Sequence, residues 1–141
     1  MYIFIKYHNV INLSKYIINY CKELKASITN LKLIKILYLV NVDYYELFDE
    51  YLFPKEYIDF KSWKILGPYI PAVWNHYKYY TSNELPRQRD YIEVVRDDDA
   101  EILNTLLDNY IDCSTYRLVQ LSKRKHFYDE VVDEEYSAYF S

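Results

Sequence analysis

Histidine and cysteine supply many of the metal ligands and nucleophiles of proteins, so their spacing is the first indication of chemistry. The three histidines, His8, His76 and His126, are far apart in the sequence and form no local metal-binding signature. The two cysteines, Cys21 and Cys113, are also far apart and form no CxxC pair. A Cys113–His126 or Cys21–His76 dyad stays open, although a free cysteine usually packs as a small hydrophobic residue. We expect no catalytic residue, no metal ion and no cofactor.

Two runs of charged residues are further candidates for binding chemistry. Asp97, Asp98 and Asp99 could hold a divalent cation, but carboxylates at the start of a helix usually stabilise that helix. The basic residues of segment 123–126 could contact phosphate or an acidic partner. Cations are also favoured at the C-terminus of a helix by the helix dipole. In both segments we expect the helix-stabilising role.

The composition excludes several classes of protein. The chain has 141 residues, enough for one domain, and its single glycine rules out the glycine-rich loops that bind nucleotides. The net charge of −4 provides no general attraction to nucleic acid. This charge is unevenly distributed, because residues 1–80 carry +3 and residues 81–141 carry −7. With no long apolar run and no signal-type N-terminus, we expect a soluble, cytoplasmic protein without a membrane partner.

Helices are the elements expected to position these residues. Apolar residues at helical spacing predict helices over residues 12–25 and 29–48, with Thr29 as the N-cap of the second. This second helix is apolar on most of its circumference, which is typical of a helix at the centre of a core. A short helix is expected over 56–64, and a further one begins at Pro71.

The C-terminal half is expected to add two more helices. One follows the aspartates at 97–99, with a capping box between Asp98 and Glu101, and the other opens at Asp112–Ser114. One short β-strand or hairpin is expected around 90–96. The prediction is a mainly α, single-domain bundle of about six helices over residues 1–141. Its core covers about 10–128, and residues 129–141 form an acidic, aromatic tail.

Aromatic residues are concentrated around the glycine. Trp and Tyr dominate the hot spots of protein interfaces, because they bury a large area with few rotatable bonds. The alternative for the tryptophans is a place in the core. The candidate partner-binding residues are Trp63, Tyr69, Trp74, Tyr77 and Tyr80.

Two segments together resemble a known family. Residues 27–39, SITNLKLIKILYL, resemble the T-x-L-K-L-Q-K-L-L-Y signature of the Panacea (SocA-like, or phage-associated GepA-type) antitoxin domain. Residues 60–71, FKSWKILGPYIP, resemble the A-W-x-x-G-P-V-x-P signature of the same family. The resemblance covers about residues 10–80 and extends weakly to 98–128. The signature positions, expected to be structural, are Thr29, Leu33, Lys35, Leu37, Tyr38, Gly67, Pro68 and Pro71.

The resemblance implies a non-enzymatic protein that neutralises a partner protein. Members of this family act as antitoxins in bacterial and prophage toxin–antitoxin pairs, and some deliver the bound toxin to a protease. In this interpretation the aromatic residues contact the toxin, or Lys35 and Tyr38 hold the aromatic corner in place from the central helix.

Two other functions remain open. A phage- or plasmid-encoded anti-defence inhibitor, similar to an anti-CRISPR protein, could use the acidic half of the chain to occupy the basic groove of a nuclease. A DNA-binding regulator could use helices 12–25 and 29–48 as a helix-turn-helix, although the negative net charge makes direct nucleic-acid binding less favourable.

Overall fold

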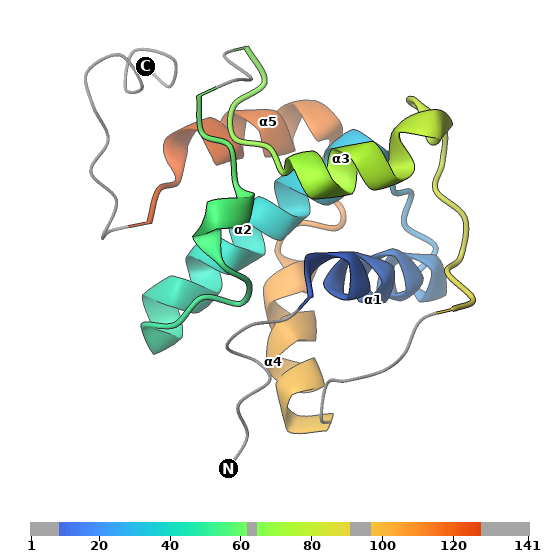
Figure 1. Ribbon diagram of the computed structural model, residues 1–141. Helices are drawn as coiled ribbons and strands as arrows, with labels where there is room; N and C mark the ends of the chain where they lie inside the picture. The colour runs from blue at the N-terminus through green and yellow to red at the C-terminus, as the bar shows by residue number, and fades with distance from the viewer. Residues whose placement is uncertain (1–8, 62–64, 91–96, 128–141) are drawn as a thin grey trace.

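The computed structural model describes residues 9–61, 65–90 and 97–127. Within these residues the chain is mainly α, as predicted, and forms five α-helices together with two short 3-10 helices (Figure 1). None of the helices among the described residues is long and apolar enough to cross a bilayer. The helices are α1 (Val10–Glu23), α2 (Asn30–Phe48), η2 (Lys55–Tyr57), α3 (Pro71–Tyr77), η3 (Lys78–Tyr80), α4 (Asp97–Asp108) and α5 (Thr115–Arg124).

Two predicted elements differ from the structure or lie outside it. Residues 62–64 of the helix expected over 56–64 lie outside the described chain. Over 56–61 the structure has only the end of η2, because the backbone of Asp59 pairs with Tyr69 in an isolated antiparallel bridge. The two N–H···O distances of this bridge are 2.7 and 3.0 Å. The strand expected around 90–96 falls almost entirely on residues 91–96, outside the described part of the chain.

Helix ends follow the local signals of the sequence in most places. The Thr29 side chain accepts a hydrogen bond from Lys32 N at 3.3 Å, so it is the N-cap of α2 as predicted. Ser114 caps α5 in the same way, and Pro71 is in the first turn of α3. The helix α4 begins at Asp97, and the capping box expected at Asp98 involves side chains outside those that the structure describes.

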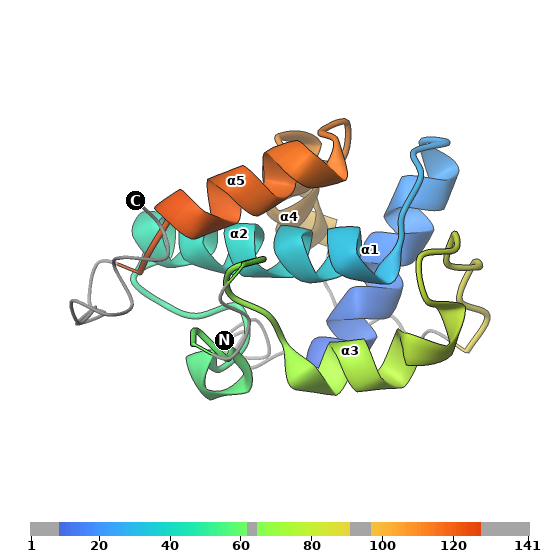
Figure 2. The ribbon, with the colours of Figure 1, turned by 90° about the horizontal axis from the view of Figure 1, so that it is seen from above.

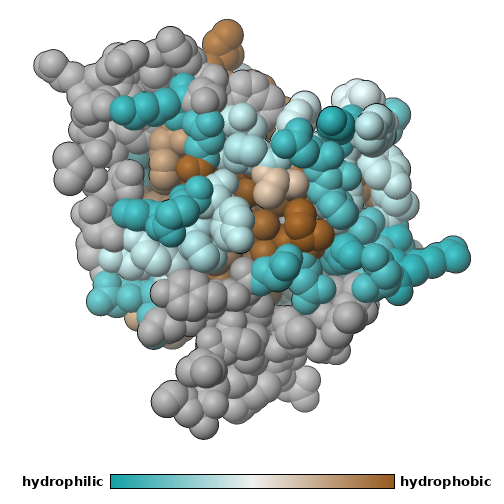
Figure 3. Space-filling view, in the orientation of Figure 1, coloured by the Kyte–Doolittle hydropathy of each residue, from teal (hydrophilic) through white to brown (hydrophobic). Residues whose placement is uncertain are grey.

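The helix α2 is the centre of the fold. Its residues from Asn30 to Tyr45 are buried except for Leu31, and Figure 2 shows it between α5 on one side and α3 on the other. The helices α1 and α4 also contact it. On the face seen in Figure 1 most residues are hydrophilic, and hydrophobic ones gather near the middle, where α1 and α3 adjoin (Figure 3). A helix surrounded on all sides must be apolar on all sides, which is the pattern in its sequence.

The polar side chains of α2 connect this central helix to the segments around it. Lys32 Nζ donates to the carbonyl oxygen of Ile111 at 2.7 Å, just beyond α4. Asn41 accepts from Leu52 N at 2.7 Å and donates to Phe53 O at 3.0 Å, so it fixes the loop after α2. Since a buried polar group is costly unless it is hydrogen-bonded, these contacts determine where each segment lies.

An ionic cluster joins α2 to the segments that flank α5. The Asp43 carboxylate accepts hydrogen bonds from the Tyr110 hydroxyl and from the Lys125 ammonium group. Lys125 also donates to the Tyr110 oxygen at 3.1 Å, and its backbone carbonyl accepts from Tyr38 at 2.5 Å. Burial, followed by the hydrogen bond to Asp43, raises the pKa of Tyr110 to about 12. The basic segment 123–126 therefore contributes Lys125 to the C-cap of α5 and to this cluster.

Residues 83–90 run alongside α1 in the opposite direction. The carboxylate of Glu84 binds Lys22 at 2.6 Å and the backbone N of Ile28 at 2.8 Å. The side chain of Asn19 exchanges hydrogen bonds with the backbone of Gln88, at 2.8 and 3.0 Å. Residues 83–90 are thus held close to α1 along its length, without regular secondary structure of their own.

Replacing Asp43 with Ala should destabilise the fold strongly. The change leaves the Lys125 ammonium group and the Tyr110 hydroxyl without their shared acceptor in a largely buried place, so we expect a loss of about 2–4 kcal/mol. Urea unfolding measures this difference. The control is Glu46→Ala on the exposed face of the same helix, which should change stability by less than about 0.5 kcal/mol. Equal effects of the two substitutions would contradict the structural role of the cluster.

Candidate functional site

The turn at Leu66–Pro68 is held by a buried lysine from α2. Lys35 is fully buried, and its Nζ donates to the carbonyl oxygen of Leu66 at 2.5 Å and to that of Pro68 at 2.7 Å. Gly67, between them, has φ 84°, a left-handed conformation that is unstrained only for glycine. The residues of the two family-like signatures, Lys35 and the Gly-Pro pair, are therefore in direct contact in the fold.

Burial has a large effect on the protonation of Lys35. Loss of hydration, together with the positive charge of Lys123, lowers the pKa of Lys35 to about 7. When it is protonated, the Lys35 amine donates hydrogen bonds to both carbonyl groups of the turn. The lysine is thus a fixed part of the turn and not a solvated surface residue.

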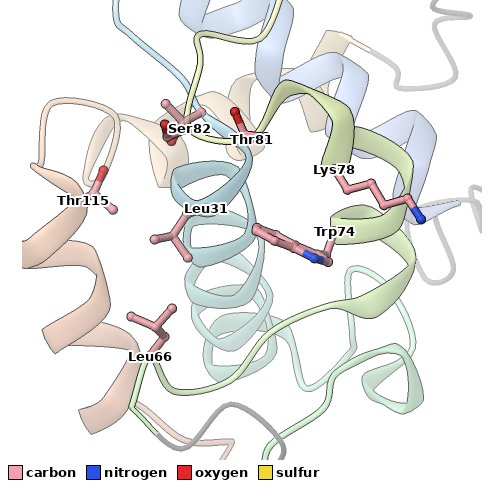
Figure 4. A pocket seen from close by; sticks show the side chains of 8 residues that line it. Leu31, Leu66, Trp74, Lys78, Thr81, Ser82 and Thr115 are labelled. Atoms are coloured by element: carbon pink, nitrogen blue, oxygen red, sulfur yellow. The ribbon is translucent and has the colours of Figure 1, made fainter.

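A pocket of about 520 Å³ opens beside this turn (Figure 4). Its apolar lining is formed by Leu31 of α2, Leu66 of the turn and Trp74 of α3. In Figure 4 the indole ring of Trp74 extends from α3 toward Leu31. The polar lining residues are Thr29, Lys78, Thr81, Ser82 and Thr115.

Local structure explains how four separate segments reach this pocket. Asn30 at the start of α2 donates to the carbonyl oxygen of Trp74 at 3.1 Å, so it joins the start of α2 to the middle of α3. Thr81 has φ 52°, and this positive value turns the chain sharply after η3. Thr115 is the first residue of α5, directly after its N-cap Ser114. The pocket is consequently a product of tertiary packing.

The segments that line the pocket also carry exposed apolar and aromatic side chains. Ile65, Tyr79, Tyr80 and Tyr116 are 80%, 87%, 39% and 74% exposed, and each is next in the chain to a lining residue. They are four of the eight large apolar or aromatic side chains that the described residues expose. We call these four residues the rim. Apolar side chains gathered at one place on a surface are typical of a binding site.

The five predicted partner-binding residues do not share one environment in the structure. Trp74 lines the pocket, and Tyr80 belongs to its rim. Tyr77 is only 3% exposed and donates its hydroxyl to Gln88 Oε1 at 3.1 Å, so it belongs to the core and not to the surface. Tyr69 is half-buried behind the turn, and Trp63 lies outside the described residues.

The predicted structural residues fall into two groups. Thr29 lines the pocket, and Lys35, Gly67 and Pro68 form the adjoining turn, which leads into α3 at Pro71. The others, Leu33, Leu37 and Tyr38, are buried in the core. Sequence reasoning missed most of the lining, since an isolated leucine, threonine or serine carries no local signal. The missed residues are Leu31, Leu66, Lys78, Thr81, Ser82 and Thr115.

Cys21 and His76, one of the two pairs considered from the sequence, have contacts of other kinds. Cys21 is fully buried, and burial raises its pKa to about 11, which opposes formation of a reactive thiolate. The ring of His76 lies edge-on to that of Tyr77, with centroids 4.6 Å apart. Among the described residues, no group of three or more histidine, cysteine or acidic side chains is arranged to hold a metal ion.

No protein-family model, curated protein or solved structure matches this chain. The resemblance to the Panacea domain therefore stays a prediction from the sequence.

The stability of the protein should depend on pH through Lys35. Unfolding restores the usual lysine pKa of about 10.5, so above pH 7 the unfolded chain holds a proton that the folded chain has lost. The free energy of unfolding should rise with pH between 7 and 8.5, by at most about 1.4 kcal/mol per unit. Urea unfolding at several pH values measures this slope.

Two variants isolate the contribution of Lys35. Lys35→Met removes the titrating group, and Lys35→Arg keeps the charge at every pH, so both should lose the rise. The range stops at pH 8.5 because above about pH 9 the raised pKa of Cys21 contributes a fall in stability with pH, which offsets the rise from Lys35. An unchanged slope in whichever variant folds would show that another group titrates.

Proposed function

We propose that this protein is a non-catalytic binding module that neutralises a partner protein, in the manner of an antitoxin. The observation that carries the proposal is that the segments lining the Leu31–Leu66–Trp74 pocket also carry four exposed apolar or aromatic side chains. These are Ile65, Tyr79, Tyr80 and Tyr116. Tyrosine and tryptophan with neighbouring aliphatic side chains are typical of protein interfaces.

The character of the pocket supports binding over turnover. Among its lining residues Lys78 is the one ionisable group, while the others are apolar side chains or hydroxyl groups. A hydrolytic or acid–base site needs at least two cooperating groups at short distance, such as a nucleophile and its base. The lining of this pocket offers no such pair.

The family resemblance is in keeping with the same function. The signature residues Lys35, Gly67 and Pro68 build the turn that forms one wall of the pocket. A wall held by buried hydrogen bonds is rigid, and a rigid site loses little entropy on binding. The partner in this proposal is a bacterial or prophage toxin, which is either blocked directly or delivered to a protease.

The second candidate function is inhibition of a defence nuclease. It is favoured by the charge of −7 over residues 81–141, where α4 exposes Glu101 and Asp108. A nuclease cleavage assay with added protein tests this function, and unchanged cleavage by a panel of defence nucleases would exclude it. The helix-turn-helix interpretation loses its basis, because α2 is enclosed as far as Tyr45 and cannot enter a DNA groove.

Removal of the Tyr79 ring should weaken partner binding at least tenfold. The protein is co-expressed with the product of its neighbouring gene, and the affinity of the purified complex is measured by calorimetry. Tyr79 is exposed, so Tyr79→Ala should leave the unfolding free energy unchanged while it removes a rim contact. Tyr116→Ala, on α5, should have the same effect.

The matched control is Leu47→Ala, which removes a similarly exposed apolar side chain at the other end of α2. Leu47 is about 24 Å along the helix from Leu31, so it should not affect binding at the pocket. Equal loss of affinity in Leu47→Ala, or none in the rim variants, would place the interface elsewhere. Failure of any complex to form would reject the neighbouring gene product as the partner.

A further inference from the structure

We propose that the pocket receives one large apolar side chain from an acidic segment of the partner, so that carboxylates beside this anchor meet the positively charged edge of the pocket. This inference rests on the proposed function and names the chemistry of the segment that binds.

The size and lining of the pocket fit an apolar anchor. Its volume of about 520 Å³ is within the range of about 300–1,000 Å³ that is usual for ligand sites. Leu31, Leu66 and Trp74 provide the apolar contacts, and an aromatic or large aliphatic side chain gains most from such a surface. The hydroxyl groups of Thr81, Ser82 and Thr115 can bind the backbone of the same segment.

The charges of the lining favour an acidic occupant. Lys78 is a lining residue, and none of the lining residues is acidic. In Figure 4 the Lys78 side chain points away from Leu31, and its Nζ lies 5.5 Å from the Tyr79 ring centroid. Its ammonium group is therefore placed for the residues that flank the anchor and not for the anchor itself.

The neighbouring charges do not cancel this effect. Glu84, two residues beyond Ser82, is already bound by Lys22 at 2.6 Å and by Ile28 N. Near Thr115, the positive charge of exposed Arg117 offsets the negative charge of exposed Asp112. The first turns of α2 and α5, which reach the lining at Thr29 and Thr115, contain no acidic residue to compensate their helix dipoles.

Four short peptides test the anchor and the charge separately. The probes are acetyl-Asp-Glu-Phe-Asp-amide, its neutral analogue acetyl-Ser-Gln-Phe-Ser-amide, its basic analogue acetyl-Lys-Lys-Phe-Lys-amide, and acetyl-Asp-Glu-Ser-Asp-amide without the ring. Binding is followed by NMR through the indole N–H signal of Trp74, assigned with the Trp63→Phe variant. We expect the acidic phenylalanine peptide to bind at least fivefold more tightly than the neutral one and the basic one to bind most weakly.

Charge reversal at Lys78 provides the control. Lys78→Glu should reverse the order of the acidic and basic peptides, whereas Lys55→Glu should not. Lys55 is a matched lysine, since its Nζ also lies over a tyrosine ring, 5.8 Å from the Tyr51 centroid, in η2. Equal binding of the acidic and neutral peptides, no shift of Trp74, or the same order in Lys78→Glu would overturn the inference.

The outcomes separate this inference from the proposed function. If the neighbouring gene product binds through Tyr79 but no peptide shifts Trp74, the partner uses the rim and the chemistry assigned to the pocket is wrong. If the acidic peptide binds at Trp74 but no protein complex forms, the proposed function fails and the pocket chemistry stands. A Trp74 shift that depends on protein concentration alone would identify a second copy of the chain as the occupant and overturn the inference.

Discussion

The hydrogen bonds from Lys35 to the carbonyl oxygens of Leu66 and Pro68 are the contact on which the candidate site depends. A buried amine loses its hydration, and only acceptors at short distance replace it. The turn must therefore stay where its carbonyl groups face α2, and Gly67 permits the backbone conformation that this requires. The position of Leu66 at the pocket follows from an interaction inside the core.

The same principle extends along the whole of α2. Most of its apolar residues form the core, while its buried polar side chains connect it to the neighbouring segments. Asn30 binds α3, Lys32 binds the end of the α4 region, and Asp43 binds the residues on both sides of α5. A helix that is enclosed on all sides can satisfy its polar groups only through such contacts, so each of them also specifies the arrangement of the loops.

This arrangement explains how irregular segments form a definite surface. The pocket is lined by the starts of α2 and α5, by α3 with the turn and loop on either side of it, and no disulfide joins these segments. Their positions come from buried hydrogen bonds to α2 and from the contacts of residues 83–90 with α1. A preorganised surface of this kind loses little conformational entropy when a partner binds, which suits a protein that acts by binding.

Local signals in the sequence were sufficient for most helices, because periodicity and capping depend on residues only a few positions apart. Thr29, Pro71 and the apolar pattern of α2 were recognised in this way. The sequence alone did not distinguish Tyr77 from Tyr79, which are of the same type and two positions apart. Packing decides between them: Tyr77 is buried with its hydroxyl bound to Gln88, and Tyr79 is exposed. In the sequence, Leu31 and Leu66 likewise look like core residues. They line the pocket because the hydrogen bonds of Asn30 and Lys35 hold their segments together.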